Sequence, residues 1–214
     1  VTAAILPGNR VPRGPAVMRA ILSTVGQRAR VFRGGGWVEE RAWTRSRSVG
    51  VPGLPARPAA VCDTPDLDIF VARYRPRVAA EFLAGLELAV LHHGLGLLGA
   101  AVRSGLVRSL APLAPSAARV AGLLERFGSD RGGMLVEAVG VDGSGETVRV
   151  GWSLVAEAGS GPHVPTLPVV AIVEAILAGS IPAPGARACV GECGSLCPVQ
   201  ADTEHSAQGR SSRL

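Results

Sequence analysis

Residues 128–168 read GSDRGGMLVEAVGVDGSGETVRVGWSLVAEAGSGPHVPTLP. This stretch predicts a loop, a strand, a tight turn, a second strand and a glycine-rich loop that leads to a helix. In the second strand, Val148, Val150, Trp152 and Leu154 alternate with small or polar residues. A period of two is typical of a strand with one buried face. Because Gly and Asp tolerate positive φ, the turn falls at Asp-Gly-Ser-Gly, residues 142–145.

The glycine-rich loop at residues 159–163, Gly-Ser-Gly-Pro-His, places backbone N–H groups and His163 next to the start of a helix. Such a loop can bind an anion or a carbonyl oxygen, or it can only connect two elements. His163 is therefore either a surface or loop-packing histidine or a contributor to a site, together with Gly159 and Gly161.

The rest of the chain alternates between short strands and helical segments. We expect a strand within residues 1–10, a helix over 15–25 and a hairpin around 34–36, and then a proline-rich connector over 50–60 that forms no regular element. Two more strands are expected at 66–74 and 77–87, although the second could begin a helix. Residues 86–127 have a helical pattern, and 166–178 predict a buried helix because they are apolar nearly all round.

The composition suits a globular chain with one ordinary core. Of the 214 residues, 47% are apolar, and all 22 basic residues are arginines, which looks like the bias of a GC-rich coding sequence. Residues 1–50 hold nine arginines against Glu39 and Glu40. Such a basic end could contact an anionic membrane surface, a phosphorylated cofactor or nucleic acid. No nucleic-acid-binding motif accompanies it, so we do not expect nucleic acid as a partner.

Gly94, Gly96 and Gly99 match the dinucleotide fingerprint G-x-G-x-x-G formally. They lie inside an apolar, helix-like stretch rather than after a strand, so they favour close helix packing instead. The apolar run over 88–102 is about 15 residues long, which is short of the roughly 20 that span a bilayer. It fits a buried helix or an interfacial segment, and contact with a membrane surface is therefore one alternative.

Metal chemistry has little support in the sequence. His92 and His93 are adjacent and point about 100° apart on a helix, so they cannot form one chelating face. Cys189, Cys193 and Cys197 fall in a polar segment without periodicity. We therefore expect no metal site and a disordered tail over 189–214. Four cysteines without a secretory signal suggest reduced thiols in a cytoplasm.

Polar residues gather on the loop before the first predicted strand of the hairpin. Ser129, Asp130 and Arg131 precede Gly132 and Gly133, and polar residues on a glycine-supported turn commonly line a cleft. The alternative is an ion pair within the loop between Asp130 and Arg131.

Several motifs in this order resemble one family of enzymes. They are PGNRVPRGPAVMRAILSTVG, CDTPDLDIFVARY, AGLELAVLHHGLGLL, FGSDRGGMLVEAVGVDGSGE and GWSLVAEAGSGPHVPTLP. Over about residues 5–190 the chain resembles the C-terminal half of bacterial saccharopine dehydrogenase-like oxidoreductases. The family's nucleotide-binding Rossmann domain has no counterpart in the sequence, and the tail after Cys189 departs from the family.

The resemblance implies an α+β fold with a mostly antiparallel sheet and helices packed on one face. Residues 1–188 would be a domain that covers the substrate and can self-associate, and the missing domain would bind NAD or NADP. The substrate would be a small or lipid-like molecule. Asp130, Arg131 and His163 would be the catalytic candidates, and Asn9, Arg10, Ser129, Gly159 and Gly161 would line the site. The alternative is a non-enzymatic association or lipid-binding module that uses the apolar segment 86–106.

Overall fold

The computed structural model describes residues 1–180, 185, 186 and 188. The chain divides into two compact units, Val1–Val164 and Pro165–Leu214. The expected disordered tail over 189–214, with its three cysteines, lies outside the described residues. No helix in the described part of the chain is both long and apolar enough to cross a lipid bilayer.

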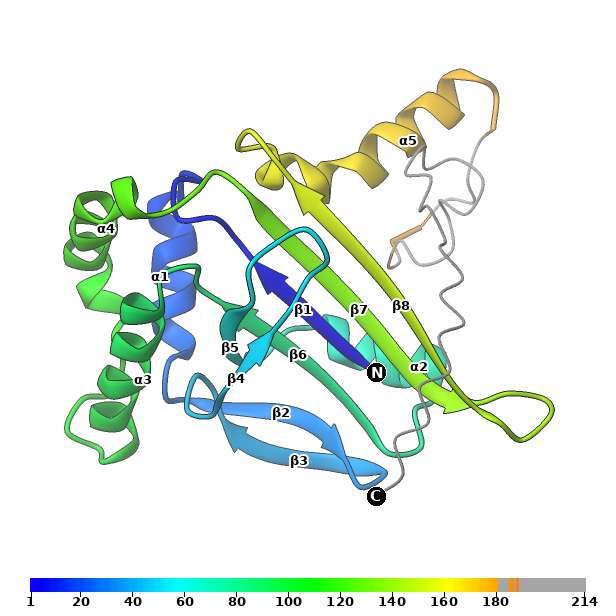
Figure 1. Cartoon of the computed structure of the whole chain (residues 1–214), viewed down its shortest axis with the longest axis horizontal. Helices are drawn as coiled ribbons and strands as arrows, with labels where there is room; N and C mark the ends of the chain where they lie inside the picture. The colour runs from blue at the N-terminus through cyan, green and yellow to red at the C-terminus, as the bar shows by residue number, and fades with distance from the viewer. Residues whose placement is uncertain (181–184, 187, 189–214) are drawn as a thin grey trace. The chain divides into compact units, whose positions relative to one another are not determined.

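The first unit is built around one mixed sheet of eight strands, in the order β3-β2-β6-β1-β7-β8, with β5 beside β6 and β4 beside β5 (Figure 1). The strands are β1 (Thr2–Leu6), β2 (Arg28–Arg33), β3 (Gly36–Arg41), β4 (Ser46–Val49), β5 (Arg57–Val61), β6 (Ala79–Gly85), β7 (Gly132–Val141) and β8 (Thr147–Ala156). Among the described strands, only β1 and β6 pair in parallel. The predicted α+β class with a mostly antiparallel sheet is confirmed.

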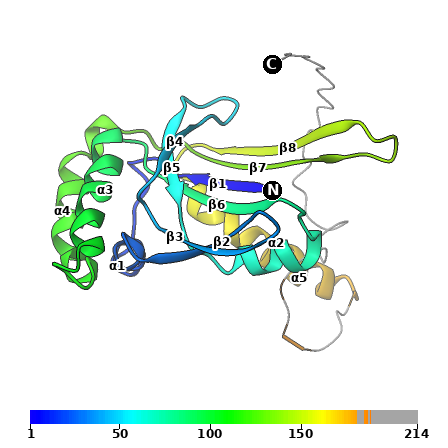
Figure 2. The same cartoon turned by 90° about the horizontal axis from the view of Figure 1, so that it is seen from below.

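Four α-helices accompany this sheet: α1 (Pro15–Thr24), α2 (Asp66–Tyr74), α3 (Ala89–Arg103) and α4 (Ala114–Leu123). Helices α1, α3 and α4 gather at one end of the sheet, and the β7–β8 hairpin extends at the other end (Figure 2). The main core joins residues from strands and these helices, including Leu6, Leu22, Leu83 and Val102. A second, smaller core lies under α2, where Leu67 packs with Phe32 and Ala80.

The hairpin that the sequence predicts at residues 132–156 is confirmed. Strands β7 and β8 pair in antiparallel register from Gly132 opposite Ala156 to Val141 opposite Thr147. The Asp142 carboxylate closes the turn, since it accepts hydrogen bonds from the backbone N–H groups of Ser144 at 2.8 Å and Glu146 at 3.0 Å. The predicted turn residues therefore act through a side chain as well as through backbone freedom.

The prediction of a buried face on β8 is wrong for the outer half of the strand. Val148 is 37% exposed and Val150 is 61% exposed. Strand β1 pairs with β7 only from Gly133 to Glu137, so the outer part of the hairpin extends beyond the sheet as a two-stranded ribbon. Alternation establishes the strand, but burial requires a neighbouring layer that this part of the hairpin lacks.

The prediction that residues 50–60 form no regular element is also wrong. Strand β5 begins at Arg57 within this segment, and β4 precedes it. Pro58 has no N–H to donate, and it lies near the start of the strand, opposite Ser48 of β4 and before the residues that pair with β6. The many prolines of residues 50–60 led to the prediction of an irregular connector, although a strand begins near the end of this segment.

Residues 66–74 form helix α2 instead of the predicted strand. Leu67, Phe70 and Val71 are spaced three and four apart and face the smaller core. Asp66 and Asp68 lie in the first helical turn, where their charge interacts favourably with the helix dipole. The apolar run in this segment is short enough to fit either period, and packing against β6 and β2 selects the helix.

In the second unit, helix α5 (Leu167–Leu177) confirms the helix predicted over 166–178. Its predicted burial is wrong, because Val169 is 61% exposed and Leu177 is 81% exposed. The described part of this unit contains no second helix or strand that could cover it.

Gly94, Gly96 and Gly99 lie inside α3, and the predicted close helix packing is confirmed for Gly99 but not for Gly94, which has nothing within 4 Å. A Cβ on Gly26, just after α1, would lie 2.6 Å from the carbonyl oxygen of Gly99. Gly26 also has φ +73°, which favours glycine. The two glycines therefore let the end of α1 approach the backbone of α3.

Candidate functional site

The carboxyl ends of the parallel strands β1 and β6 bring two loops together. In sheets with parallel strands, ligands commonly bind beside these ends. After β1 the chain turns at Pro7 and Gly8, and after β6 it reaches Glu87. Gly8 packs directly on the loop before β7, since a Cβ there would lie 2.6 Å from the carbonyl oxygen of Ser129.

The Glu87 carboxylate accepts hydrogen bonds from both loops. Its Oε2 accepts from the backbone N–H of Asn9 and of Ser129, each at 2.7 Å. Its Oε1 accepts from the Ser129 hydroxyl at 2.5 Å and from Nη2 of Arg57 at 2.7 Å. One carboxylate therefore holds the β1–α1 loop and the loop before β7 at fixed positions.

The Arg57 guanidinium completes this cluster from β5. Its side chain is only 3% exposed and forms an ion pair with Glu87. Nη1 donates to the carbonyl oxygen of Leu6 at 2.8 Å, and Nη2 donates to that of Arg131 at 3.0 Å. A planar guanidinium can satisfy several acceptors at once, so Arg57 joins β1, β6 and the start of β7.

The surroundings of the pair lower the pKa of both groups. Burial tends to raise the pKa of Glu87, but the hydrogen bonds from Ser129 and Asn9 and the charge of Arg57 outweigh it and lower that pKa. Burial lowers the pKa of Arg57, while Glu87 opposes this effect. Because four donors occupy the Glu87 carboxylate, it positions the loops and does not act as a base.

Beside this cluster lies a cleft of about 300 Å³. Asn9, Arg10, Arg13 and the carboxylate of Glu125 form its polar side, where the cations outnumber the anion by two to one. Met18 with Ala118, Ala121 and Gly122 forms an apolar side that includes part of α4. Arg13 donates from Nη2 to the carbonyl oxygen of Gly8 at 3.1 Å, and burial lowers its pKa. The arrangement suits a small ligand with an anionic or carbonyl group and an apolar portion.

The structure brings three of the predicted lining residues together. The backbone N–H of Arg10 donates to the carbonyl oxygen of Ser129 at 2.9 Å. Asn9 is buried, and its side-chain amide donates to the carbonyl oxygen of Leu124 at 3.1 Å. Asn9 and Ser129 thus stabilise the cluster through their hydrogen bonds to Glu87. Arg10 is exposed and lines the cleft.

Arg131 does not pair with Asp130 as the loop alternative proposed. Its guanidinium forms an ion pair with Glu157 at 2.8 Å and donates to the carbonyl oxygen of Gly53 at 3.1 Å. Asp130 is exposed, and its carbonyl oxygen accepts from the N–H of Gly159 at 3.1 Å. These contacts join the loop before β7 to the glycine-rich loop after β8.

His163 lies in a short 3-10 helix, Gly161–Thr166, in place of a loop. Its side chain is exposed, and its backbone N–H donates to the carbonyl oxygen of Ser160 at 2.9 Å. Gly161 lies beside Ala156 at the end of β8. Among the residues that the structure describes, no group of three or more His, Cys, Asp or Glu side chains could hold a metal ion.

Sequence reasoning missed Arg57, Glu87 and Arg13. Glu87 has a signal in the sequence, since it is the last acidic residue before a run of 37 residues, 88–124, that contains none. Arg57 has a weaker one, because it falls in the proline-rich segment and no local pattern marks it as buried. Arginine is the most abundant charged residue here, so no single arginine stands out.

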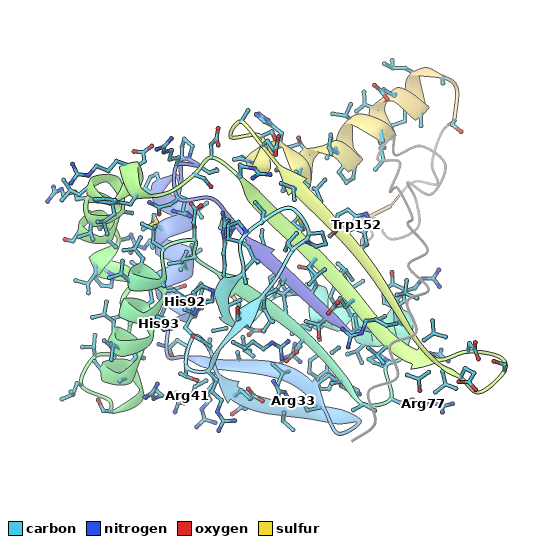
Figure 3. The ribbon with its side chains drawn as sticks, viewed as in Figure 1. Arg33, Arg41, Arg77, His92, His93 and Trp152 are labelled. Carbon is cyan, nitrogen blue, oxygen red and sulfur yellow. The ribbon has the colours of Figure 1, made fainter. Side chains whose placement is uncertain are left out.

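A second polar contact lies at α3, away from the cleft residues. His92, whose side chain is labelled in Figure 3, is 1% exposed. Its Nε2 shares a hydrogen bond of 2.7 Å with the Ser46 hydroxyl. Burial, and then the charge of His93, lower the pKa of His92 to about 4. Trp43 packs on the imidazole with ring centres 5.7 Å apart. His92 is therefore a neutral core residue at neutral pH.

The fold is similar to that of a solved structure, apo histidine-tagged saccharopine dehydrogenase (L-Glu forming) from Saccharomyces cerevisiae. The TM-score is 0.51 at 13% sequence identity, and the match covers 88% of this chain and 60% of that chain. The chain thus spans about 60% of the length of the yeast enzyme's chain. At this identity the likeness concerns the fold alone. No protein-family model matches the sequence, and no curated protein matches it either.

Proposed function

We propose that this chain is the substrate-covering domain of an NAD(P)-linked oxidoreductase that resembles saccharopine dehydrogenase. The observation that carries the proposal is the cleft beside the Arg57–Glu87 cluster, at the carboxyl ends of β1 and β6. The similarity of fold to the yeast dehydrogenase supports it over 88% of the chain.

The cleft would bind the substrate through its two arginines. Arg10 and Arg13 offer guanidinium groups, which bind carboxylate or phosphate groups in two-point contacts. Met18, Ala118 and Ala121 would contact the apolar part of the same molecule. The Arg57–Glu87 pair fixes the loop that carries Arg10 and Arg13, so both would be held in place before the substrate arrives.

The loop after β8 would contribute the second group of residues. In this proposal His163 donates a hydrogen bond to the substrate carbonyl or moves a proton, since an imidazole can do either near neutral pH. Asp130, on the loop before β7, would be a second catalytic residue. Arg131, which is paired with Glu157, would hold the loop of Gly159 and Gly161 in position.

The described residues do not fit the nicotinamide cofactor itself. The glycines at 94, 96 and 99 lie inside helix α3, not in a turn between a strand and a helix, and Gly99 packs against Val25 and Gly26, so they do not form the fingerprint's pyrophosphate cradle. We place the binding of NAD or NADP in a nucleotide-binding domain encoded before Val1. The chain alone is therefore expected to reduce no substrate.

The test begins with the coding sequence upstream of Val1. It should encode a strand, G-x-G-x-x-G and a helix, and the longer chain should bind NADH or NADPH in a fluorescence titration. With a substrate found by screening keto acids and acyl carbonyl compounds, Arg13→Ala should raise KM about tenfold or more and His163→Gln should lower kcat.

Arg28→Ala is the matched control, because Arg28 pairs with Glu39 on the exposed surface of the β2–β3 hairpin. It should change neither KM nor kcat. An upstream region without the fingerprint, or a longer chain that binds neither nucleotide, would overturn the proposal.

A further inference from the structure

Helix α3 exposes an apolar side to solvent. Leu97 is 76% exposed and Val90 is 69% exposed, while Leu98 lies beside them at 44%. His92, Gly99 and Val102 face the core from the other side of the helix. A surface helix normally presents charged or polar residues outward, so this outward side is unusual. The loop after the helix extends it with Leu106, which is 81% exposed.

Helix α4 lies beside α3 at the same end of the sheet (Figures 1 and 2). It exposes Leu123 at 77% and Val120 at 48%. Together these residues form what we call the helical surface: Val90, Leu97, Leu98, Leu106, Val120 and Leu123. Exposed apolar patches of this kind usually mark contact with a partner or a membrane.

The charge of this region is mostly positive. Residues 88–124 contain Arg103, Arg108 and Arg119 and no acidic residue, and the exposed Glu125 follows at the end of α4. All three side chains are exposed, and none forms an ion pair with any residue that the structure describes. Elsewhere the pattern differs, since most arginines of the β2–β3 hairpin have carboxylate partners at Glu39, Glu40, Glu81 or Asp68.

The neighbouring helix α1 continues the same pattern. Residues 1–38 contain no acidic residue, and Arg19 of α1 is exposed. Arg41 adds a further cation where α1 meets α3, since its Nη1 donates to the carbonyl oxygen of Gly26 at 3.3 Å (Figure 3). The end of the molecule that carries the helical surface is therefore both apolar and cationic.

We propose that the helical surface docks on an anionic lipid membrane. Exposed leucines would enter the boundary between headgroups and acyl chains, and the arginines at its edges would meet lipid phosphates. Helix α3 has 15 residues, about 22 Å at 1.5 Å per residue, so it would lie along the bilayer surface and not across it. The inference goes beyond the proposed redox role and does not depend on it.

A second copy of the chain fits this surface less well. A two-fold contact would place the surface against itself, and its three unpaired arginines outnumber the one carboxylate within residues 88–125, that of Glu125. Like charges brought together in this way disfavour association. An anionic bilayer supplies both the apolar layer and the negative charge that the surface lacks.

The test is flotation of the chain with vesicles of phosphatidylcholine, with and without phosphatidylglycerol. We expect co-flotation with the anionic vesicles, weaker flotation with the neutral ones, and loss of binding as salt is raised. The double variant Leu97→Gln/Leu106→Gln should lower the partition coefficient about tenfold or more. Arg103→Gln/Arg108→Gln should lower it about fivefold for each arginine removed.

Two matched controls lie outside the helical surface. Val141→Gln/Val150→Gln removes exposed valines from the β7–β8 ribbon, and Arg73→Gln/Arg77→Gln removes exposed cations near α2. Neither should change flotation, and circular dichroism should show that every variant is folded.

Absence of flotation, equal flotation with neutral vesicles, or flotation that the helical-surface variants do not reduce would overturn the proposal. A chain that does not float, but that forms a dimer in light scattering, would also overturn it if Leu97→Gln/Leu106→Gln converts that dimer to a monomer. That result would assign the surface to a second copy. Cofactor binding by the longer chain is measured separately, so the two proposals can fail independently.

Discussion

At the scale of single residues, the site depends on one buried ion pair. Arg57 lies in β5, and Glu87 lies in the loop after β6. Arg57 donates to the carbonyl oxygen of Leu6, and Glu87 accepts from the backbone N–H groups of Asn9 and of Ser129 in the loop before β7. A buried charge that loses its partner is costly, because the remaining charge stays in a low-dielectric environment. The pair is therefore a point where a small chemical change should have a large effect.

Replacing Glu87 by Gln keeps the shape of the side chain but leaves the Arg57 charge without a counter-ion. We expect a loss of about 3 kcal/mol in the free energy of unfolding at pH 7, measured by urea denaturation. Because the folded pKa of Glu87 lies below its ordinary value of 4.5, its stabilisation is present above that value and is lost as pH falls through the folded pKa.

The difference in the free energy of unfolding between the wild type and Glu87→Gln should therefore become smaller as the pH falls through the folded pKa of Glu87. Glu39→Gln is the control, because both partners of the Arg28–Glu39 pair are more than half exposed, and it should cost less than about 1 kcal/mol. Equal effects of the two substitutions at pH 7 would contradict this role for Glu87.

His92 should give the fold a second dependence on pH. Its pKa falls from 6.5 to about 4 in the folded chain, so between these values the unfolded chain binds more protons. Stability should then decrease by up to about 3 kcal/mol as pH falls from 6.5 to 4. His92→Gln should flatten this slope in urea denaturation, whereas His93→Gln removes only the smaller cause of the pKa shift and should leave most of the slope. A slope that survives His92→Gln would assign it to another group.

At the scale of elements, sequence patterns identified most strands and helices but not all of them. The β7–β8 hairpin, α1 and the helices of 86–127 have clear periods or turn residues, and they appear where expected. Residues 66–74 form a helix because Leu67 and Phe70 find a packing surface on β6, which no local pattern reveals. Strand β5 was not predicted because Pro58 normally opposes pairing, and only the register shows that it lies near the start of the strand, outside the residues that pair with β6.

The contact between α1 and α3 offers a test at this scale. Gly26→Ala would force a Cβ to within 2.6 Å of the Gly99 carbonyl oxygen at φ +73°. We expect it to cost about 2 kcal/mol or more in thermal or urea unfolding. Gly34→Ala is the matched control, since Gly34 has φ +60° but nothing within 4 Å, and it should cost about 1 kcal/mol. Equal costs would mean that the approach of the helices is not tight.

At the scale of the whole molecule, the described cores belong to the first unit. Every residue of both hydrophobic clusters falls within Val1–Val164. This unit contains the whole sheet, the Arg57–Glu87 cluster, the cleft and the helical surface. It should therefore fold without the segment that begins at Pro165.

A chain that ends at Val164 should unfold cooperatively, with a midpoint within about 5 °C of that of the full chain by circular dichroism. A chain that ends at Arg131 is the control, because it lacks β7 and β8 and leaves β1 without its antiparallel neighbour, and it should lose the cooperative transition. A broad, non-cooperative transition for the chain that ends at Val164 would show that the first unit needs the second.

The sequence by itself determined the hairpin of residues 132–156 and the helical run after residue 86, because periodicity and turn chemistry are local properties, and its resemblance to an enzyme family indicated the α+β class. The role of Asn9, Arg10 and Ser129 in lining a site stays a prediction. The tertiary structure alone decided that Arg57 meets Glu87, that Arg131 pairs with Glu157 and that the leucines of α3 face outward. These outcomes depend on which strands pair and which helix sides are covered, and such long-range contacts leave no mark in the local pattern of residues.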